Sequence, residues 1–230
     1  MQKNLGFVNI RCLSWNHKTT GKQSDMMTAD KDGISLERDT TMCCDPKVWF
    51  PMRVTYSREL KVKAELDRLE IENFIPMKYK LVDANTENPH RELVPAINNL
   101  IFVHSTQERI SHLKSKNEVL EPLRYMMDHT AEETHTIMTV PDGQMENFIR
   151  VASRTDDSVI FLDNETVVGK EGKCVEIMGG AFEGVTGVIR RVKRCKRVVV
   201  EIEGVASVAI AFVPAEILQE IERSKYNVVL

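Results

Sequence analysis

The sequence contains few cysteines and none of the cysteine spacings that bind zinc. Its five cysteines stand at positions 12, 43, 44, 174 and 195, an odd number with no C-x-x-C pair. Disulfide frameworks are typical of oxidising compartments, and structural zinc sites use paired cysteines. We therefore expect reduced thiols in a cytoplasmic protein, with no bound metal and no other cofactor.

Long apolar runs and a strong excess of charge are absent as well. No stretch of about 18 apolar residues could span a bilayer, and the N-terminus lacks the order of a secretory signal. We expect no membrane association. The formal net charge is −3, which argues against a surface that is basic throughout. Any nucleic-acid contact must therefore be local.

Catalytic patterns are missing too. No serine, histidine and aspartate follow one another with the glycine elbow of a hydrolase, and no pair of acids stands in a recognisable pocket motif. The histidines show no metal-ligand spacing. This holds for His90, His104, His112, His129 and His135. We predict that the protein is not an enzyme and has no catalytic residues.

The most informative stretch that is present runs from Leu100 to Val103 and is apolar at every position. Because successive side chains of a strand point to opposite faces, Ile101 and Val103 share one face, and Leu100 and Phe102 share the other. The chain's own helices can cover one face. The other has no obvious internal partner, so we predict an open apolar face that docks a partner helix or coiled coil. The alternative is that the N-terminal arm or the C-terminal half covers it.

Hydrophobic periodicity around this stretch predicts an α+β domain. Strands are expected at 49–56, 74–82, 100–105 and 123–127, with a polar loop at 83–91. Helices are expected at 57–70, capped by Ser57, after a capping box at 105–108, and from 142 onward. This order of strands and helices is the split β-α-β unit of a ferredoxin-like sandwich, in which helices cover one face of the sheet.

The composition changes after residue 155. Seven of the eleven glycines fall between Gly169 and Gly204, among short segments rich in valine and isoleucine. This pattern predicts a small β-barrel in which Val175 and Ile177 point inward and glycines form tight turns, among them Gly184 and Gly187. The β-branched residues at 198–200 favour strands, so we predict a barrel that does not switch to helices.

The predicted organisation follows from these patterns. It comprises a disordered arm at 1–46, the sandwich at 47–154, a linker at 155–167, the barrel at 168–222 and a tail at 223–230. A basic cluster lies around a predicted hairpin of the barrel: Arg190, Arg191, Lys193, Arg194, Lys196 and Arg197. Two interpretations of the cluster stay open. It is either a solvated turn that protects an edge strand or a phosphate contact to nascent RNA or DNA.

Three segments together resemble the NusG family of transcription elongation factors. They are Trp49-Phe50 followed by residues 73–77, the segment 99–103, and residues 171–188, which look like a KOW motif. The resemblance spans about residues 48–221 and is strongest to specialised paralogues of the RfaH and UpxY kind. One departure is the segment 97–100, which lacks the proline and aromatic residue that the family usually has there.

The resemblance implies a ferredoxin-like NGN domain followed by a KOW domain that is a small SH3-like β-barrel, in a monomeric factor. It implies that the NGN domain binds the clamp helices of the RNA polymerase largest subunit and suppresses pausing or termination at selected operons, such as capsular polysaccharide clusters. By position, the polymerase-binding residues would be Trp49, Arg53, Leu100 and Phe102.

In the KOW loop, Phe182 would contact a small-subunit ribosomal protein or a termination factor, although a phenylalanine there is equally expected in the barrel core. The basic cluster would contact nascent RNA or non-template DNA. The alternative function is a KOW-type RNA-binding or ribosome-associated protein, in which the sandwich is only structural. The target operon, any recruiting element and any dedicated inhibitor are not specified by the sequence.

Overall fold

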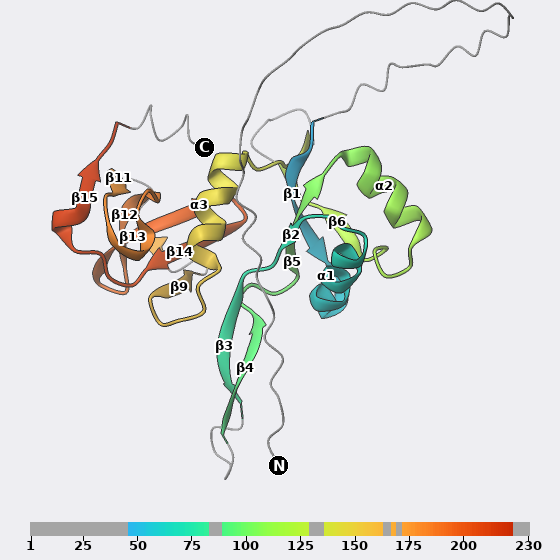
Figure 1. Ribbon diagram of the computed structural model, residues 1–230, viewed down its shortest axis with the longest axis horizontal. Coiled ribbons are helices and arrows are strands. Elements are labelled where there is room, and N and C mark those ends of the chain that lie inside the picture. Colours follow the sequence, from blue (N-terminus) through green and yellow to red (C-terminus); the bar gives the residue numbers. More distant parts are fainter. Residues whose placement is uncertain (1–45, 83–88, 129–135, 163–166, 169–171, 223–230) are drawn as a thin grey trace, which may run out of the picture. The chain divides into compact units, whose positions relative to one another are not determined.

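Strand β5 (Leu100–Ser105), the apolar stretch singled out above, lies inside a four-stranded sheet of the computed structural model (Figure 1). The structure describes residues 46–82, 89–128, 136–162, 167–168 and 172–222. The strand order is β2-β5-β1-β6, with β1 at Val48–Val54, β2 at Asn73–Phe74 and β6 at Leu123–Tyr125. All three pairings are antiparallel. The arm predicted at 1–46 lies outside the described residues apart from Pro46, and so does the whole tail.

Helices α1 (Glu59–Arg68) and α2 (Gln107–Lys116) cover one face of this sheet. Val62 and Leu66 of α1 are buried there, and Leu69, the next apolar residue at helical spacing, is half-buried. Ile101 and Val103 belong to the same cluster and are fully buried. The predicted alternation of β5 is therefore correct on this face.

The starts of both helices differ from the prediction by one residue. Ser57 does not cap α1, because it belongs to the 3-10 turn η1 (Thr55–Ser57) and Arg58 precedes the helix. In α2 the cap is Thr106, whose side-chain oxygen accepts a hydrogen bond from the Arg109 backbone N–H at 3.2 Å. The predicted capping box that began at Ser105 is therefore wrong.

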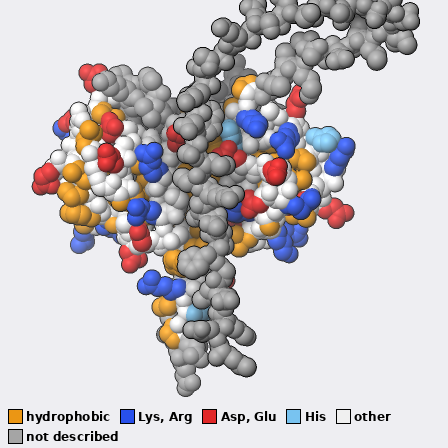
Figure 2. Space-filling model, viewed as in Figure 1, with side chains coloured by type: hydrophobic (Ala, Val, Ile, Leu, Met, Phe, Trp, Pro, Cys, Tyr) orange, Lys and Arg blue, Asp and Glu red, His pale blue; other side chains and the backbone are white. Residues whose placement is uncertain are grey.

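A second hairpin interrupts the region predicted as one strand and a loop. Strand β3 (Met77–Val82) pairs with β4 (His90–Pro95) in a separate two-stranded sheet. The loop predicted at 83–91 therefore gives way to a strand from His90 onward. Tyr79 stands opposite Leu93, and both side chains are about half exposed. Figure 2 shows hydrophobic side chains at the surface of this hairpin, at the bottom of the view.

In the chain, a short hairpin and the third helix follow the four-stranded sheet and precede the C-terminal half. The hairpin pairs β7 (Met127–Asp128) with β8 (Thr136–Ile137). Helix α3 spans Asp142–Ala152. Its residues Met145, Phe148 and Ala152 are buried, and Ile149 is half-buried.

The C-terminal half is a sheet in the order β15-β11-β12-β13-β14-β9, and β10 pairs with β12. Its elements are β9 (Val159–Leu162), β10 (Val167–Val168), β11 (Cys174–Ile177), η2 (Gly180–Phe182), β12 (Thr186–Val192), β13 (Cys195–Ile202), β14 (Ala206–Ile210), η3 (Ala215–Ile217) and β15 (Leu218–Glu220). We call this sheet with its turns the barrel. Strand β9 falls within the predicted linker and pairs with β14, because its four residues are all apolar.

The two glycines predicted to form turns have different roles. Gly184 has a φ of +76° and does form a turn. Gly187 lies in β12, where a Cβ would come within 2.7 Å of a Val198 methyl carbon and 2.8 Å of the Val199 carbonyl oxygen. Glycine is needed there for close packing of two strands, not for a turn.

Residues 44–230 form a single compact unit, and the predicted boundaries between sandwich, linker and barrel stay a prediction. No helix in the described part of the chain has the length and apolar character needed to cross a membrane.

Candidate functional site

The polymerase-binding residues proposed from the sequence share one face of the four-stranded sheet. Arg53 stands directly opposite Leu100, and Pro51 opposite Phe102, in the antiparallel pairing of β1 with β5. Opposed residues of a ladder point to the same face. Trp49 lies two and four residues before Pro51 and Arg53, so it points to that face as well. We call this side of the sheet the α3 face.

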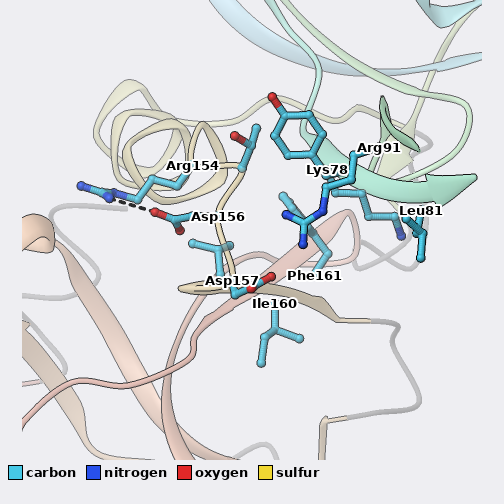
Figure 3. A pocket seen from close by; sticks show the side chains of 11 residues that line it. Lys78, Leu81, Arg91, Arg154, Asp156, Asp157, Ile160 and Phe161 are labelled. Atoms are coloured by element: carbon cyan, nitrogen blue, oxygen red, sulfur yellow. Dashed lines mark hydrogen bonds and ion pairs between the residues drawn. The ribbon is translucent and has the colours of Figure 1, made fainter. Parts of the chain in front are cut away.

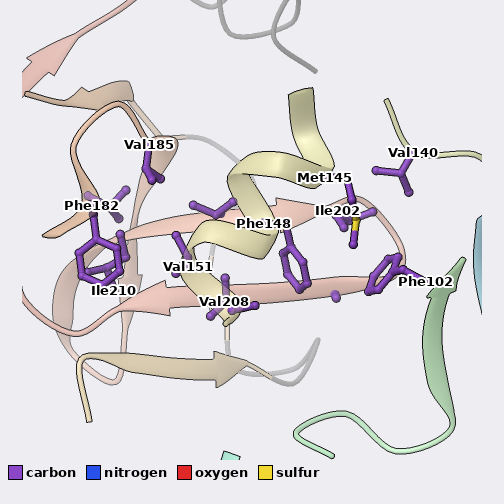
Figure 4. Packing of buried hydrophobic residues seen from close by; sticks show 14 of the residues in the cluster. Phe102, Val140, Met145, Phe148, Val151, Phe182, Val185, Ile202, Val208 and Ile210 are labelled. Carbon is purple, nitrogen blue, oxygen red and sulfur yellow. The ribbon is translucent and has the colours of Figure 1, made fainter. Parts of the chain in front are cut away.

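The α3 face is covered within the chain. Leu100 is 1% exposed and Phe102 is fully buried. The ring centroid of Phe102 lies 5.6 Å from that of Phe148 in α3 (Figure 4). Phe74 of β2 meets the same Phe148 ring edge-on at 6.4 Å. The prediction that this face is open is therefore wrong. The third helix supplies the internal partner that the prediction lacked.

Trp49 is held at the start of β1 from both sides. Its ring stacks on that of His104 with centroids 4.8 Å apart, and its carbonyl accepts a hydrogen bond of 2.8 Å from the Val140 N–H. The His104 Nδ1 atom in turn lies 2.7 Å from a carboxylate oxygen of Glu72. Trp49 is 5% exposed, so it acts here as part of the core. Arg53, by contrast, is exposed at the other end of the strand.

The opposite side of α3 packs against the barrel. Phe148 belongs to a single buried cluster with barrel side chains that include Val200 and Val208. The buried core therefore runs from the α3 face through α3 into the barrel without a break. Its other buried barrel members are Val175, Ile177, Phe182, Val185, Val198, Ile202, Ala206 and Ile210.

Polar contacts fix how α3 lies on the barrel. Gln144 Nε2 donates to the Glu201 carbonyl at 3.0 Å, and Arg150 Nη1 donates to the Glu183 carbonyl at 3.0 Å. Between them, Asn147 Nδ2 donates to the Thr186 hydroxyl at 2.8 Å, and both side chains are buried. The three helix residues are spaced by three, so they project from one side of α3.

A hollow lies beside the β3–β4 hairpin (Figure 3). Hairpin residues Lys78 and Arg91 line one side, and Arg154 with Asp156 lines another. Asp156 accepts hydrogen bonds from Ser158 and from Arg154, and the Ser158 hydroxyl is the main reason that the pKa of this carboxyl lies below its ordinary value. Arg154 and Asp156 form an ion pair of 3.3 Å there. No group of potential metal ligands occurs in the described ranges.

Phe182 lies in the turn before β12 and is 8% exposed. The Arg154 guanidinium lies 5.0 Å from its ring centroid, and the ring belongs to the cluster beneath α3. Of the two interpretations left open, burial favours the core. Its role in contacting a partner stays a prediction that requires the ring to be uncovered.

The basic cluster divides into two groups. Arg190 donates two hydrogen bonds, of 2.6 and 2.8 Å, to the Glu201 carboxylate, and Arg197 donates to the Ala211 carbonyl. Both are only partly exposed. The remaining four are exposed: Arg191, Lys193, Arg194 and Lys196.

Two features of the site were missed at the level of the sequence. The first is that Phe148 covers Phe102. The sequence signal for this contact was the apolar face of the third helix, which had not been assigned to either face of the sheet. The other is Asn99, which has a φ of +59° just before β5. Asparagine tolerates this left-handed conformation, and its Oδ1 accepts a hydrogen bond of 3.1 Å from the Ser57 N–H. The turn before β5 is thereby tied to the start of α1.

Comparison with known proteins points to one family. Residues 47–149 match the family model described as "Transcription termination factor nusG". No curated protein matched the chain. Among solved structures, one described as "Domain interaction in Thermotoga maritima NusG" aligns over 76% of this chain and 98% of its own, with 17% identity and a TM-score of 0.38. Over residues 47–149 the chain is thus similar to the NusG family of transcription factors.

Proposed function

We propose that this protein is a transcription elongation and antitermination factor that binds RNA polymerase through its N-terminal sheet domain and suppresses pausing or termination. The observation that carries the proposal is the family match over residues 47–149. The polymerase element would be the clamp helices of the largest subunit. The resemblance to specialised paralogues of the UpxY and RfaH kind suggests action at selected operons.

The fold is compatible with the two domains that this function requires. The order β2-β5-β1-β6, with α1 after β1 and α2 after β5, supports a ferredoxin-like NGN sandwich. The antiparallel strands from β11 to β15 support an SH3-like KOW barrel.

Burial of Leu100 and Phe102 adds a condition to the proposal. A partner helix pair cannot reach these side chains while α3 and the barrel cover them. In the proposed function, the barrel leaves α3 before polymerase binds. This separation uncovers apolar side chains of α3 but leaves Phe102 beneath Phe148, so the polymerase would first take the place of the barrel on α3. The exposed Arg53 lies at the border of this surface and would meet the polymerase first.

The proposal can be tested by measuring the affinity of the full chain for purified core polymerase. Asn147→Ala leaves the buried Thr186 hydroxyl without its partner, which costs about 1–3 kcal/mol, so barrel docking should weaken and polymerase binding should tighten. Arg53→Glu should weaken binding. Glu146→Ala, at an exposed position of the same helix, is the matched control.

An elongation assay with a downstream terminator supplies the functional readout. We expect more readthrough with the protein than without it, and more with Asn147→Ala than with the original chain. If neither the original chain nor Asn147→Ala binds core polymerase, the proposal is wrong.

The runner-up, a KOW-type RNA-binding or ribosome-associated protein, is favoured by one observation. Four exposed cations gather at one end of the barrel: Arg191, Lys193, Arg194 and Lys196. Binding to ribosomes or RNA together with a failure to bind polymerase would favour this function.

A further inference from the structure

A second hollow lies between the β3–β4 hairpin and the barrel, and its charge has one sign. Its volume is about 590 Å³, which falls within the range of about 300–1,000 Å³ of small-molecule sites. The charged side chains that line it are Arg53 of β1 and Lys78 and Lys80 of β3. None of its lining residues in the described part of the chain is acidic. We call this cavity the basic hollow.

The first hollow, shown in Figure 3, contains two acidic side chains that the basic hollow lacks, Asp156 and Asp157. In the basic hollow, no hydrogen bond or ion pair engages the side chains of the three cations within the described residues. Glu92 stands opposite Lys80 across the hairpin, but the two form no ion pair. Three neighbouring cations without a partner create a positive potential, so the basic hollow is suited to an anion.

The rest of the lining of the basic hollow is mainly apolar. Ile97 after β4, Phe161 of β9 and Val205 before β14 line it, and each of these side chains is only half-buried. All three pack against the buried core that joins the α3 face to the barrel. A ligand that covers them would remove apolar surface from water, which favours binding.

We propose that the basic hollow binds a small organic phosphate. The phosphate group would meet the three cations, and an apolar or aromatic body would cover Ile97, Phe161 and Val205. Arginine and lysine are usual partners of phosphate groups. A phosphate monoester carries about 1.5 to 2 negative charges at neutral pH, so it matches three cations better than a single carboxylate does.

Such a ligand would contact two parts of the molecule at once. Arg53, Lys78 and Lys80 belong to the two N-terminal sheets, whereas Phe161 and Val205 belong to the barrel. A ligand that binds only the docked arrangement stabilises that arrangement by mass action. It would therefore hold the barrel against α3. This inference does not rest on polymerase binding, and its test contains no polymerase.

The test titrates the full chain with naphthyl phosphate, an aromatic phosphate monoester, and measures binding by calorimetry. Naphthol and inorganic phosphate each lack one half of this probe and are the comparison compounds. We expect naphthyl phosphate to bind at least about tenfold more tightly than either of them, because charged hydrogen bonds and apolar contacts act together.

Two variants and a matched control locate the site. Lys78→Gln with Lys80→Gln should weaken the binding of naphthyl phosphate about tenfold or more, because two charged partners are lost. Val205→Asp places a carboxylate on the barrel side of the hollow and should weaken it as well. Arg91→Gln removes a cation of the same hairpin that lines only the first hollow, and should leave affinity within about twofold because salt screens distant charges. Melting curves check that each variant is folded, and the lysine variant decides because both positions are exposed.

Hydrogen exchange gives the second readout. Saturating naphthyl phosphate should slow exchange in α3 and β12, because it holds the barrel in place, and should leave α1 unchanged. Unchanged affinity in the lysine variant, an equal loss in Arg91→Gln, or equal binding of naphthyl phosphate and one of its halves would each overturn the site. Exchange in α3 and β12 that does not respond to the bound probe would overturn the bridging of hairpin and barrel.

Discussion

The side chains on the two faces of the four-stranded sheet are equally buried, but different elements cover them. Ile101 on one face and Phe102 on the other are both fully buried. The first face is closed by α1 and α2, which follow directly after the two central strands. The α3 face is closed by α3 with the barrel behind it, and buried polar groups such as Asn147 and Thr186 stand in that outer layer.

This difference has a physical consequence. Interfaces between domains are more polar than permanent cores and separate more readily. Both sides bury polar residues: Glu59 and Ser105 lie on the α1 and α2 side, and Asn147 and Thr186 lie between α3 and the barrel. The proposed function requires that only the contact between α3 and the barrel opens. Equal burial does not mean equal permanence.

The largest expected effect tests whether the α3 face is closed in solution. Phe102→Ala removes a fully buried ring that packs on Phe148, so it should lower the free energy of unfolding by about 3–5 kcal/mol. Urea denaturation followed by fluorescence measures this. A loss below about 1 kcal/mol would show that the ring is not sealed.

A smaller effect distinguishes the two sides of the molecule. Asn147→Ala should weaken the docking of the barrel by about 1–3 kcal/mol, because the Thr186 hydroxyl loses its partner. Hydrogen exchange should become faster in α3 and β12 and stay unchanged in α1. Glu146→Ala should leave all three elements as they are, and faster exchange in α1 would contradict the proposed division.

The smallest effect belongs to the α1 and α2 side. Glu65 accepts hydrogen bonds from Arg68 and from Asn117, which lower its pKa from the ordinary value of 4.5 to about 2. A carboxyl whose pKa is lower in the folded protein stabilises it fully above pH 4.5, and this contribution is lost as the pH falls toward 2. Glu65→Gln should remove this part of the acid sensitivity in thermal melts between those pH values. An unchanged pH profile in that variant would contradict the assignment.

Local patterns predicted much of the fold correctly. The alternation of β5 and the helical spacing of Val62 and Leu66 identify which side chains are buried, because the periods of strands and helices are set by the backbone. They did not reveal β4 at 90–95, where charged residues alternate with few apolar ones in an exposed hairpin. They also did not reveal the role of Gly187, because the contact it permits lies on the neighbouring strand.

For the candidate site, periodicity correctly placed Leu100 and Phe102 on one face, and the family resemblance added Arg53 to it. The predicted state of that face was wrong. Its cover comes from α3, which is distant in the sequence. The apolar stripe of α3 shows that the helix is buried, but not against which surface.

The sequence by itself determined which side chains of β5 point together, that a β-rich half follows the first domain, and that positive charge concentrates around one hairpin. These features follow from interactions between residues close in the chain. Only the tertiary structure decided that Phe148 seals Phe102, that Glu201 engages Arg190, and that Arg191 lies on a strand paired on both sides. Such contacts join segments whose separation in the chain carries no periodic signal, so packing alone selects them.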